Sequence, residues 1–237
     1  MSLGRLWLYA PNHPMPSSTH SSKPRRTEAL VRLRENLTGR NLLDLANQYQ
    51  VPIQFGSKKN KGWVGQTIER AAGLNTSNEA GPDGADFELK TTEVSFSENH
   101  WVPKETLKIT QLNPQQILEE EFETSIFWRK LGCLLIVAYE SSSPDLIQVR
   151  KMTSVQIKNE KLILEIRSFW EDVRHTVCSG EIKDLINMGS SAGLIQLRPL
   201  GDGKQRSLCP ITGDTFPARA FYGTKKLLNF LLNEESL

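Results

Sequence analysis

The stretch Ala85-Asp86-Phe87-Glu88-Leu89-Lys90-Thr91-Thr92-Glu93-Val94 alternates polar and apolar residues with a period of two. This alternation is typical of a half-buried β-strand, in which successive side chains point to opposite faces. Phe87 and Leu89 are therefore predicted to enter a core, while Glu88 and Lys90 project together from the other face. The sequence thus predicts a strand that presents two opposite charges side by side.

Helical and strand patterns alternate on both sides of this stretch. The apolar spacing predicts a helix from about Thr27 to Leu37 and another over residues 64–72, which ends near Gly73. Further strands are predicted at residues 106–112, 134–139, 146–149, 162–166 and 194–197, and further helices at residues 42–50, 114–122, 168–178 and 225–233. This mixture predicts an α/β (mixed α+β) fold with a central sheet flanked by helices.

The composition is that of an ordinary globular protein. Of the 237 residues, 38% are hydrophobic and 24% are charged, and single domains commonly extend to roughly 250 residues. Residues 1–22 are rich in proline, serine and threonine, which predicts a flexible leader before a single domain at residues 23–237. The longest apolar run, from Leu131 to Tyr139, is too short to cross a bilayer, and the cysteines form no CxxC motif. These features argue against a membrane-spanning protein and a disulfide framework, and they predict a cytoplasmic location.

Charge is informative only in its distribution. The net charge of +2 does not by itself indicate a nucleic-acid partner. Bases nevertheless gather locally, for example at Lys58, Lys59 and Lys61. Taken alone, each such cluster is most simply interpreted as a solvated surface.

A predicted turn before the strand brings a third charge close to Glu88. Asp83 lies five residues before Glu88 and can place its carboxylate beside it, which would form an oxygen-lined pocket for a hard cation such as Mg²⁺. The backbone carbonyl of Leu89 could add another ligand. Asp86 is an alternative first ligand, because it lies on the same predicted strand face as Glu88. Asp83 is preferred, since a residue from a turn can reach around the metal.

Two carboxylates beside an amine suit the hydrolysis of a phosphodiester. The cation can polarise a phosphoryl oxygen, and Lys90 can either orient or deprotonate the attacking water. The residues leave a second interpretation open, in which Glu88 and Lys90 form an exposed charge pattern and Asp83 only makes a turn.

Motifs that extend along most of the chain favour the first interpretation. Two of them are Lys61-Gly62-Trp63-Val64-Gly65-Gln66-Thr67-Ile68-Glu69 and Phe87-Glu88-Leu89-Lys90-Thr91. The others are, in order, Thr124-Ser125 with Arg129-Lys130-Leu131, Trp170-Glu171-Asp172, Gly180-Glu181-Ile182, Ile195-Gln196-Leu197-Arg198-Pro199, Arg219-Ala220-Phe221-Tyr222 and Lys225-Lys226. This series resembles the signature of the MutH family of DNA endonucleases, which includes a mismatch-repair nicking enzyme and related restriction enzymes that cut at GATC. The resemblance covers residues from about 27 to 232 and implies a restriction-endonuclease-like central mixed sheet with a DNA cleft.

The resemblance also implies roles for individual residues. The implied catalytic group is Glu69, Asp83, Glu88, Lys90 and Lys130, in which Glu69 joins Asp83, Glu88 and the Leu89 carbonyl as a metal ligand. The implied DNA-binding group is Lys61, Arg198, Pro199 and Tyr222, in which Arg198 and Pro199 belong to a base-reading loop and Tyr222 senses methylation. The catalytic part would span residues 23–125 and the DNA-reading part residues 126–237. Each residue also has a structural alternative, such as a core aromatic for Tyr222.

The resemblance implies Mg²⁺ as the cofactor, with Mn²⁺ as a substitute, and double-stranded DNA as the partner. A monomer would cut one strand per engagement, whereas a DNA-induced dimer could cut both. The chain is expected to act as a type II restriction enzyme at GATC-like sites with methylation sensitivity, alongside a cognate DNA methyltransferase. The alternatives are a MutH-type strand-nicking enzyme that works with mismatch-repair proteins and a catalytically silent DNA-binding module.

Restriction is preferred because the sequence departs from the repair-enzyme pattern in two places. The stretch between Gly73 and Glu88 is shorter than the family pattern, and the pair Gly223-Thr224 adds a residue between Tyr222 and Lys225. Both departures affect the first metal ligand and the reading loop rather than the catalytic lysine.

Overall fold

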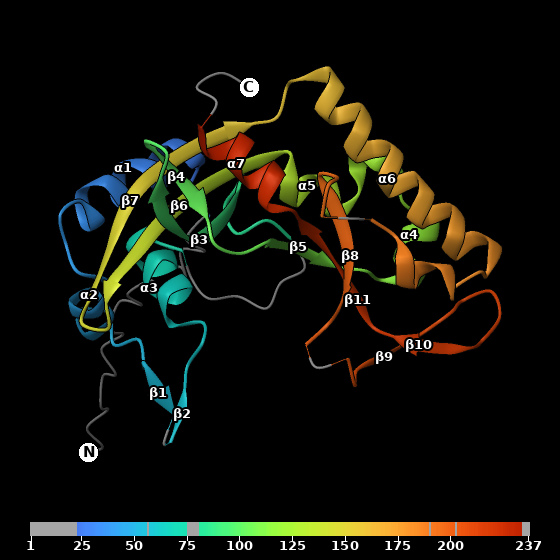
Figure 1. Ribbon diagram of the computed structural model, residues 1–237, viewed down its shortest axis with the longest axis horizontal. Coiled ribbons are helices and arrows are strands. Elements are labelled where there is room, and N and C mark those ends of the chain that lie inside the picture. The colour runs from blue at the N-terminus through green and yellow to red at the C-terminus, as the bar shows by residue number, and fades with distance from the viewer. Residues whose placement is uncertain (1–22, 56, 75–80, 190, 202, 234–237) are drawn as a thin grey trace, which may run out of the picture.

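The strand that carries the charged stretch, β3 (Glu88–Ser97), lies inside a four-stranded sheet of order β4-β3-β6-β7. It runs parallel to β6 (Cys133–Ser143) and antiparallel to β4 (His100–Pro103), and β6 pairs antiparallel with β7 (Leu146–Gln156). The computed structural model describes residues 23–55, 57–74, 81–189, 191–201 and 203–233 (Figure 1). The leader predicted at residues 1–22 lies outside these described residues.

A second sheet has three strands in the order β5-β11-β8, all antiparallel. These strands are β5 (Leu107–Gln111), β11 (Arg219–Gly223) and β8 (Ile195–Pro199). Because β5 joins this sheet while β6 and β7 complete the other, a division of the chain near residue 125 does not separate the two sheets. Two short hairpins, β1 (Gln54–Phe55) with β2 (Lys58–Lys59) and β9 (Arg206–Leu208) with β10 (Thr215–Pro217), project toward the same side of the molecule (Figure 1).

Strand β6 is buried on both faces, which explains its continuous apolar sequence. Leu135 and Val137 share one core with the helices α1 (Arg26–Leu37), α2 (Leu42–Gln48) and α3 (Trp63–Ala71). Leu134 and Ile136 point to the other core. That core is shared with the remaining helical segments, which are α4 (Pro114–Glu119), η1 (Phe122–Thr124), α5 (Ile126–Leu131), α6 (Glu160–Ser179), η2 (Asp184–Asn187) and α7 (Lys225–Asn233).

The arrangement confirms the predicted fold class. A central mixed sheet has helices on both faces, which is consistent with a restriction-endonuclease-like fold. The predicted helix at residues 225–233 coincides with α7, and the predicted strand at residues 85–94 appears as β3, shifted by three residues.

The strand predicted at residues 162–166 is wrong, because this segment is part of the 20-residue helix α6. Asn159 caps the helix, and its side chain accepts hydrogen bonds from the backbone N–H groups of Lys161 and Leu162. Ile166 and Trp170 are buried four residues apart, which is a helical rather than a strand period. No helix in the described part of the chain is long and apolar enough to span a membrane.

Candidate active site

Glu88, the first residue of β3, is the centre of the charged cluster. Its side chain is buried, with 1% of the residue exposed. Its Oε1 accepts hydrogen bonds from Lys90 Nζ at 2.6 Å and from Lys130 Nζ at 3.0 Å. Lys130 lies at the end of α5, far from β3 in sequence. Burying the carboxylate is tolerable only because these two ammonium groups compensate its charge.

Asp83 is fixed beside Glu88 by two backbone hydrogen bonds. Its N–H donates to Glu88 Oε2 at 3.1 Å, and its Oδ2 accepts from the N–H of Leu89 at 3.0 Å. The loop between them folds tightly at Gly84, where a Cβ atom would lie 1.9 Å from the Phe87 ring. Gly84 therefore lets the loop return Asp83 to the start of the strand.

Asp86 lies outside this cluster. Its Oδ1 accepts from the backbone N–H of Arg26 at 2.8 Å, at the beginning of α1. The geometry thus favours Asp83 over Asp86 as the neighbour of Glu88.

Glu69 approaches the same carboxylates from helix α3. Burial raises the pKa of Glu69 above its usual range, and the negative charge of Asp83 raises it further. Burial likewise raises the pKa of Asp83, and the charge of Glu88 adds to the effect. Three carboxylates from a helix, a loop and a strand therefore crowd one another, and the crowding disfavours their ionised forms.

The chemistry of this donor set fits a hard divalent cation, which binds carboxylate oxygens and would relieve their mutual repulsion. Among residues 23–233, as far as they are described, no three or more His, Cys, Asp or Glu side chains form a ready metal site. A cation that used Glu88 Oε1 would have to displace Lys90 and Lys130 from that atom.

Two of the predicted DNA-binding residues, Arg198 and Tyr222, meet on the three-stranded sheet. The guanidinium carbon of Arg198, on β8, lies 5.0 Å from the ring centroid of Tyr222, on β11. Arg198 also donates a hydrogen bond to Thr106 Oγ1 at 2.7 Å. Pro199 follows Arg198 at the exposed end of β8, and Lys61 is exposed in the turn between β2 and α3.

No sequence motif singled out Lys108, which lies on β5 directly opposite Tyr222 in the antiparallel register. Partial burial lowers the pKa of Lys108, and the positive charges of Lys90 and Lys130 lower it further. The sequence feature that could have indicated Lys108 is its position between two apolar residues, Leu107 and Ile109, which are both buried while the lysine is exposed.

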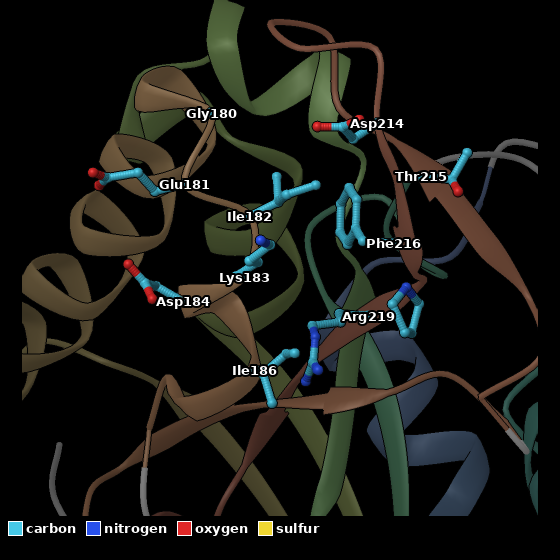
Figure 2. A pocket seen from close by; sticks show the side chains of 11 residues that line it. Gly180, Glu181, Ile182, Lys183, Asp184, Ile186, Asp214, Thr215, Phe216 and Arg219 are labelled. Carbon is cyan, nitrogen blue, oxygen red and sulfur yellow. The ribbon is translucent and has the colours of Figure 1, made fainter.

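A cavity of about 780 Å³ lies elsewhere, between the segment after α6 and the strands β10 and β11 (Figure 2). Its walls are residues 180–184 and 186 on one side and residues 214–217 and 219 on the other, and no member of the carboxylate and lysine cluster lines it. Arg219, which is 4% exposed, contributes to it, and its side-chain Nε has no hydrogen-bond partner among the described residues. Burial lowers the pKa of this guanidinium.

Comparison with known proteins finds similarity to mismatch-repair proteins named MutH. Residues 71–163 match the family model described as DNA mismatch repair enzyme MutH. The DNA mismatch repair protein MutH of Haemophilus influenzae strain Rd is 26% identical over 234 residues, which cover 90% of this chain and 99% of the relative. The protein of the same name from Haemophilus ducreyi is 29% identical over 76% of this chain and 80% of its own length, and that of Shewanella woodyi is 26% identical over 77% and 79%.

The mixed sheet, with carboxylates and lysines gathered at the start of one central strand, fits the class of restriction-endonuclease-like enzymes. Within that class, the matched model and the broad coverage of the relatives make the chain similar to MutH proteins.

Proposed function

We propose that this protein is a divalent-metal-dependent DNA endonuclease that nicks one strand of a duplex at or near GATC sites during mismatch repair. The observation that carries the proposal is the buried Glu88 carboxylate, held between Asp83, Lys90 and Lys130 in a chain that is similar to MutH proteins. A purely structural ion pair would not need two further carboxylates with raised pKa values beside it.

The proposed metal ligands are the carboxylates of Glu69, Asp83 and Glu88, together with the backbone carbonyl of Leu89. Mg²⁺ suits these oxygen donors, and Mn²⁺ would substitute for it. A bound cation supplies Lewis-acid stabilisation of the negative charge that develops on the phosphoryl group. Asp83 is held at the strand by the Leu89 N–H, so the first ligand is positioned before the metal arrives.

Lys90 and Lys130 are proposed to act on the phosphate and on the attacking water. Their side chains are 18% and 17% exposed, so the ammonium groups retain access to solvent and substrate. With Glu88 engaged by a cation, their ammonium groups would be free to donate hydrogen bonds to phosphate oxygens. Water attacks phosphorus and gives up a proton, the bond to the 3′ oxygen breaks, and that oxygen takes up a proton, which leaves a 5′-phosphate and a 3′-hydroxyl.

The three-stranded sheet is proposed to read the DNA. Arg198 can donate two hydrogen bonds to guanine O6 and N7, and Tyr222 lies beside it to test adenine methylation. Lys61 and Pro199 would make further contacts to the DNA. Phosphate contacts fix the register of the duplex, while the contacts of Arg198 and Tyr222 in the groove select the sequence.

The comparisons favour repair over the restriction role that the sequence alone suggested. The three relatives carry the name DNA mismatch repair protein MutH, and the matched family model is described as DNA mismatch repair enzyme MutH. Repair proteins are accordingly the proposed partners, in place of a cognate methyltransferase. A catalytically silent DNA-binding module is disfavoured, because the acidic and basic residues that catalysis would need are all present.

A supercoiled plasmid with unmethylated GATC sites tests the proposal. With Mg²⁺, the protein should convert it to the open circle, with little linear product, and sequenced ends should map to GATC. Rapid linearisation would instead support restriction. Loss of cutting in EDTA is expected, and unspecific or metal-independent cutting would refute the proposal.

A further inference from the structure

We propose that Lys108 binds a DNA phosphate that lies between the cleaved bond and the bases read by the three-stranded sheet. This inference rests on the proposed endonuclease function. Nothing in the sequence motifs or in the comparisons points to this residue.

The position of Lys108 in the sheet supplies the first argument. Lys108, Tyr222 and Gln196 are cross-strand partners on β5, β11 and β8. Leu107 and Ile109, on either side of Lys108, are both buried, so the lysine occupies the open face of β5. Lys108 is therefore the neighbour of the residue proposed to sense methylation.

The start of β5 also contacts Arg198. Thr106, which immediately precedes β5, accepts the hydrogen bond from Arg198, whose guanidinium lies over the ring of Tyr222. Thr106 and Lys108 thus bring the beginning of β5 to both Arg198 and Tyr222.

The charges around Lys108 supply the second argument. Helix α5, which carries Lys130, packs against β5, and the charges of Lys90 and Lys130 both act on Lys108. Lys90 and Lys130 share one carboxylate, that of Glu88. The Lys108 side chain, by contrast, has no hydrogen bond or ion pair within the described residues, and no described carboxylate neutralises its charge directly. Its ammonium group is therefore available to bind an anion at this point.

A DNA phosphate is the anion that fits. A duplex carries phosphates at regular spacing, so one that is bound between the cluster and the reading face would set the distance between the recognised base and the cleaved bond. An exposed lysine with no role would be the alternative. It does not explain why the lysine lies directly opposite Tyr222 in the sheet, within reach of the charges of Lys90 and Lys130.

The experiment measures how salt weakens the binding of a GATC-containing duplex in EDTA, by fluorescence anisotropy. Each lost phosphate contact reduces the slope of log K against log salt by about 0.9. Between 50 and 200 mM salt, the DNA affinity of the wild type should therefore fall about 3.5-fold more than that of Lys108→Met. Lys108→Arg should retain the wild-type slope.

Lys104→Met is the matched control, because Lys104 is an exposed lysine near β5 that already pairs with Glu93. It should leave the slope unchanged. At saturating DNA and Mg²⁺, Lys108→Met should also nick more slowly and at less uniform positions around GATC, whereas a merely structural role would not change the cleavage position. Thermal melting of both variants should match the wild type.

An unchanged slope for Lys108→Met, or an equal change for Lys104→Met, overturns the inference. A wild type that binds the duplex but never nicks it would overturn the proposed endonuclease function alone. The dependence of DNA binding on salt would then still test whether Lys108 contacts a phosphate. A wild type that binds no DNA overturns both.

Discussion

Glu69 is a single residue of the candidate active site whose ionised form destabilises the folded protein. Its raised pKa arises first from burial and then from the charge of Asp83, so its ionised form is destabilised in the native protein. Residues that are held in unfavourable surroundings are typical of functional sites. The residue patterns alone indicated the Asp83 and Glu88 pair, whereas Glu69 was added only by the family resemblance.

In EDTA at neutral pH, Glu69→Gln should raise the free energy of unfolding by about 1 kcal/mol, or roughly 2–4 °C in the melting temperature. The native state of the wild type holds the Glu69 proton more tightly than the unfolded state does, because the native pKa is raised. The wild type therefore loses stability as the pH rises through that pKa and regains it as the pH falls. The advantage of Glu69→Gln should accordingly disappear on acidification.

Glu35→Gln, at an exposed glutamate of α1, is the control and should change little at any pH. Thermal melts over a pH series make the measurement. A Glu69→Gln variant that is less stable than the wild type at neutral pH would contradict the electrostatic description of the cluster.

Tyr222 is the second residue with a specific expectation. Tyr222→Phe removes only the hydroxyl and leaves the ring beneath Arg198. The ratio of nicking rates on unmethylated and adenine-methylated duplexes should change, while the rate on unmethylated DNA stays within about twofold. Tyr49→Phe, just after α2, is the control. An unchanged ratio would remove the sensing role from Tyr222.

Helix α5 is the element that completes the cluster, because it delivers Lys130 to Glu88. The patterns did not predict it, since its six residues are too few to show a clear period. Ser125 begins the helix: its Oγ accepts from the Trp128 N–H at 3.1 Å and donates to the Phe122 carbonyl at 2.7 Å. The wrong strand at residues 162–166 has the opposite cause, since five residues of a long amphipathic helix can resemble a short strand.

Ser125→Ala should destabilise the protein by about 1 kcal/mol, because it removes the cap of α5. It should also slow nicking about tenfold or more, since Lys130 loses its fixed position. Asn159→Ala removes the corresponding cap of α6, which carries no proposed site residue, and should cost similar stability without changing the nicking rate. Equal effects of the two variants on the rate would show that α5 has no special role.

The molecule as a whole combines two sheets whose strand pairing could not be predicted from sequence patterns. Local alternation predicted β3, β5 and β8 as strands, but it contains no information on which strands pair. The pairing of β5 with β11, more than a hundred residues away, is what brings Lys108 and Tyr222 together. The family resemblance predicted which residues form the site, whereas the hydrogen bonds of Glu88 to Lys90 and Lys130 are seen only in the folded structure.

The most direct test compares the Mg²⁺-dependent nicking rates of Glu88→Gln and Glu93→Gln on supercoiled plasmid. Both glutamates lie on β3, but Glu93 pairs at the surface with Lys104, whereas Glu88 is buried in the cluster. Glu88→Gln should slow nicking at least about 100-fold, equivalent to about 3 kcal/mol of transition-state stabilisation, while Glu93→Gln stays within about twofold of the wild type. A folded Glu88→Gln protein that nicks at the wild-type rate would contradict the assignment of this cluster as the active site.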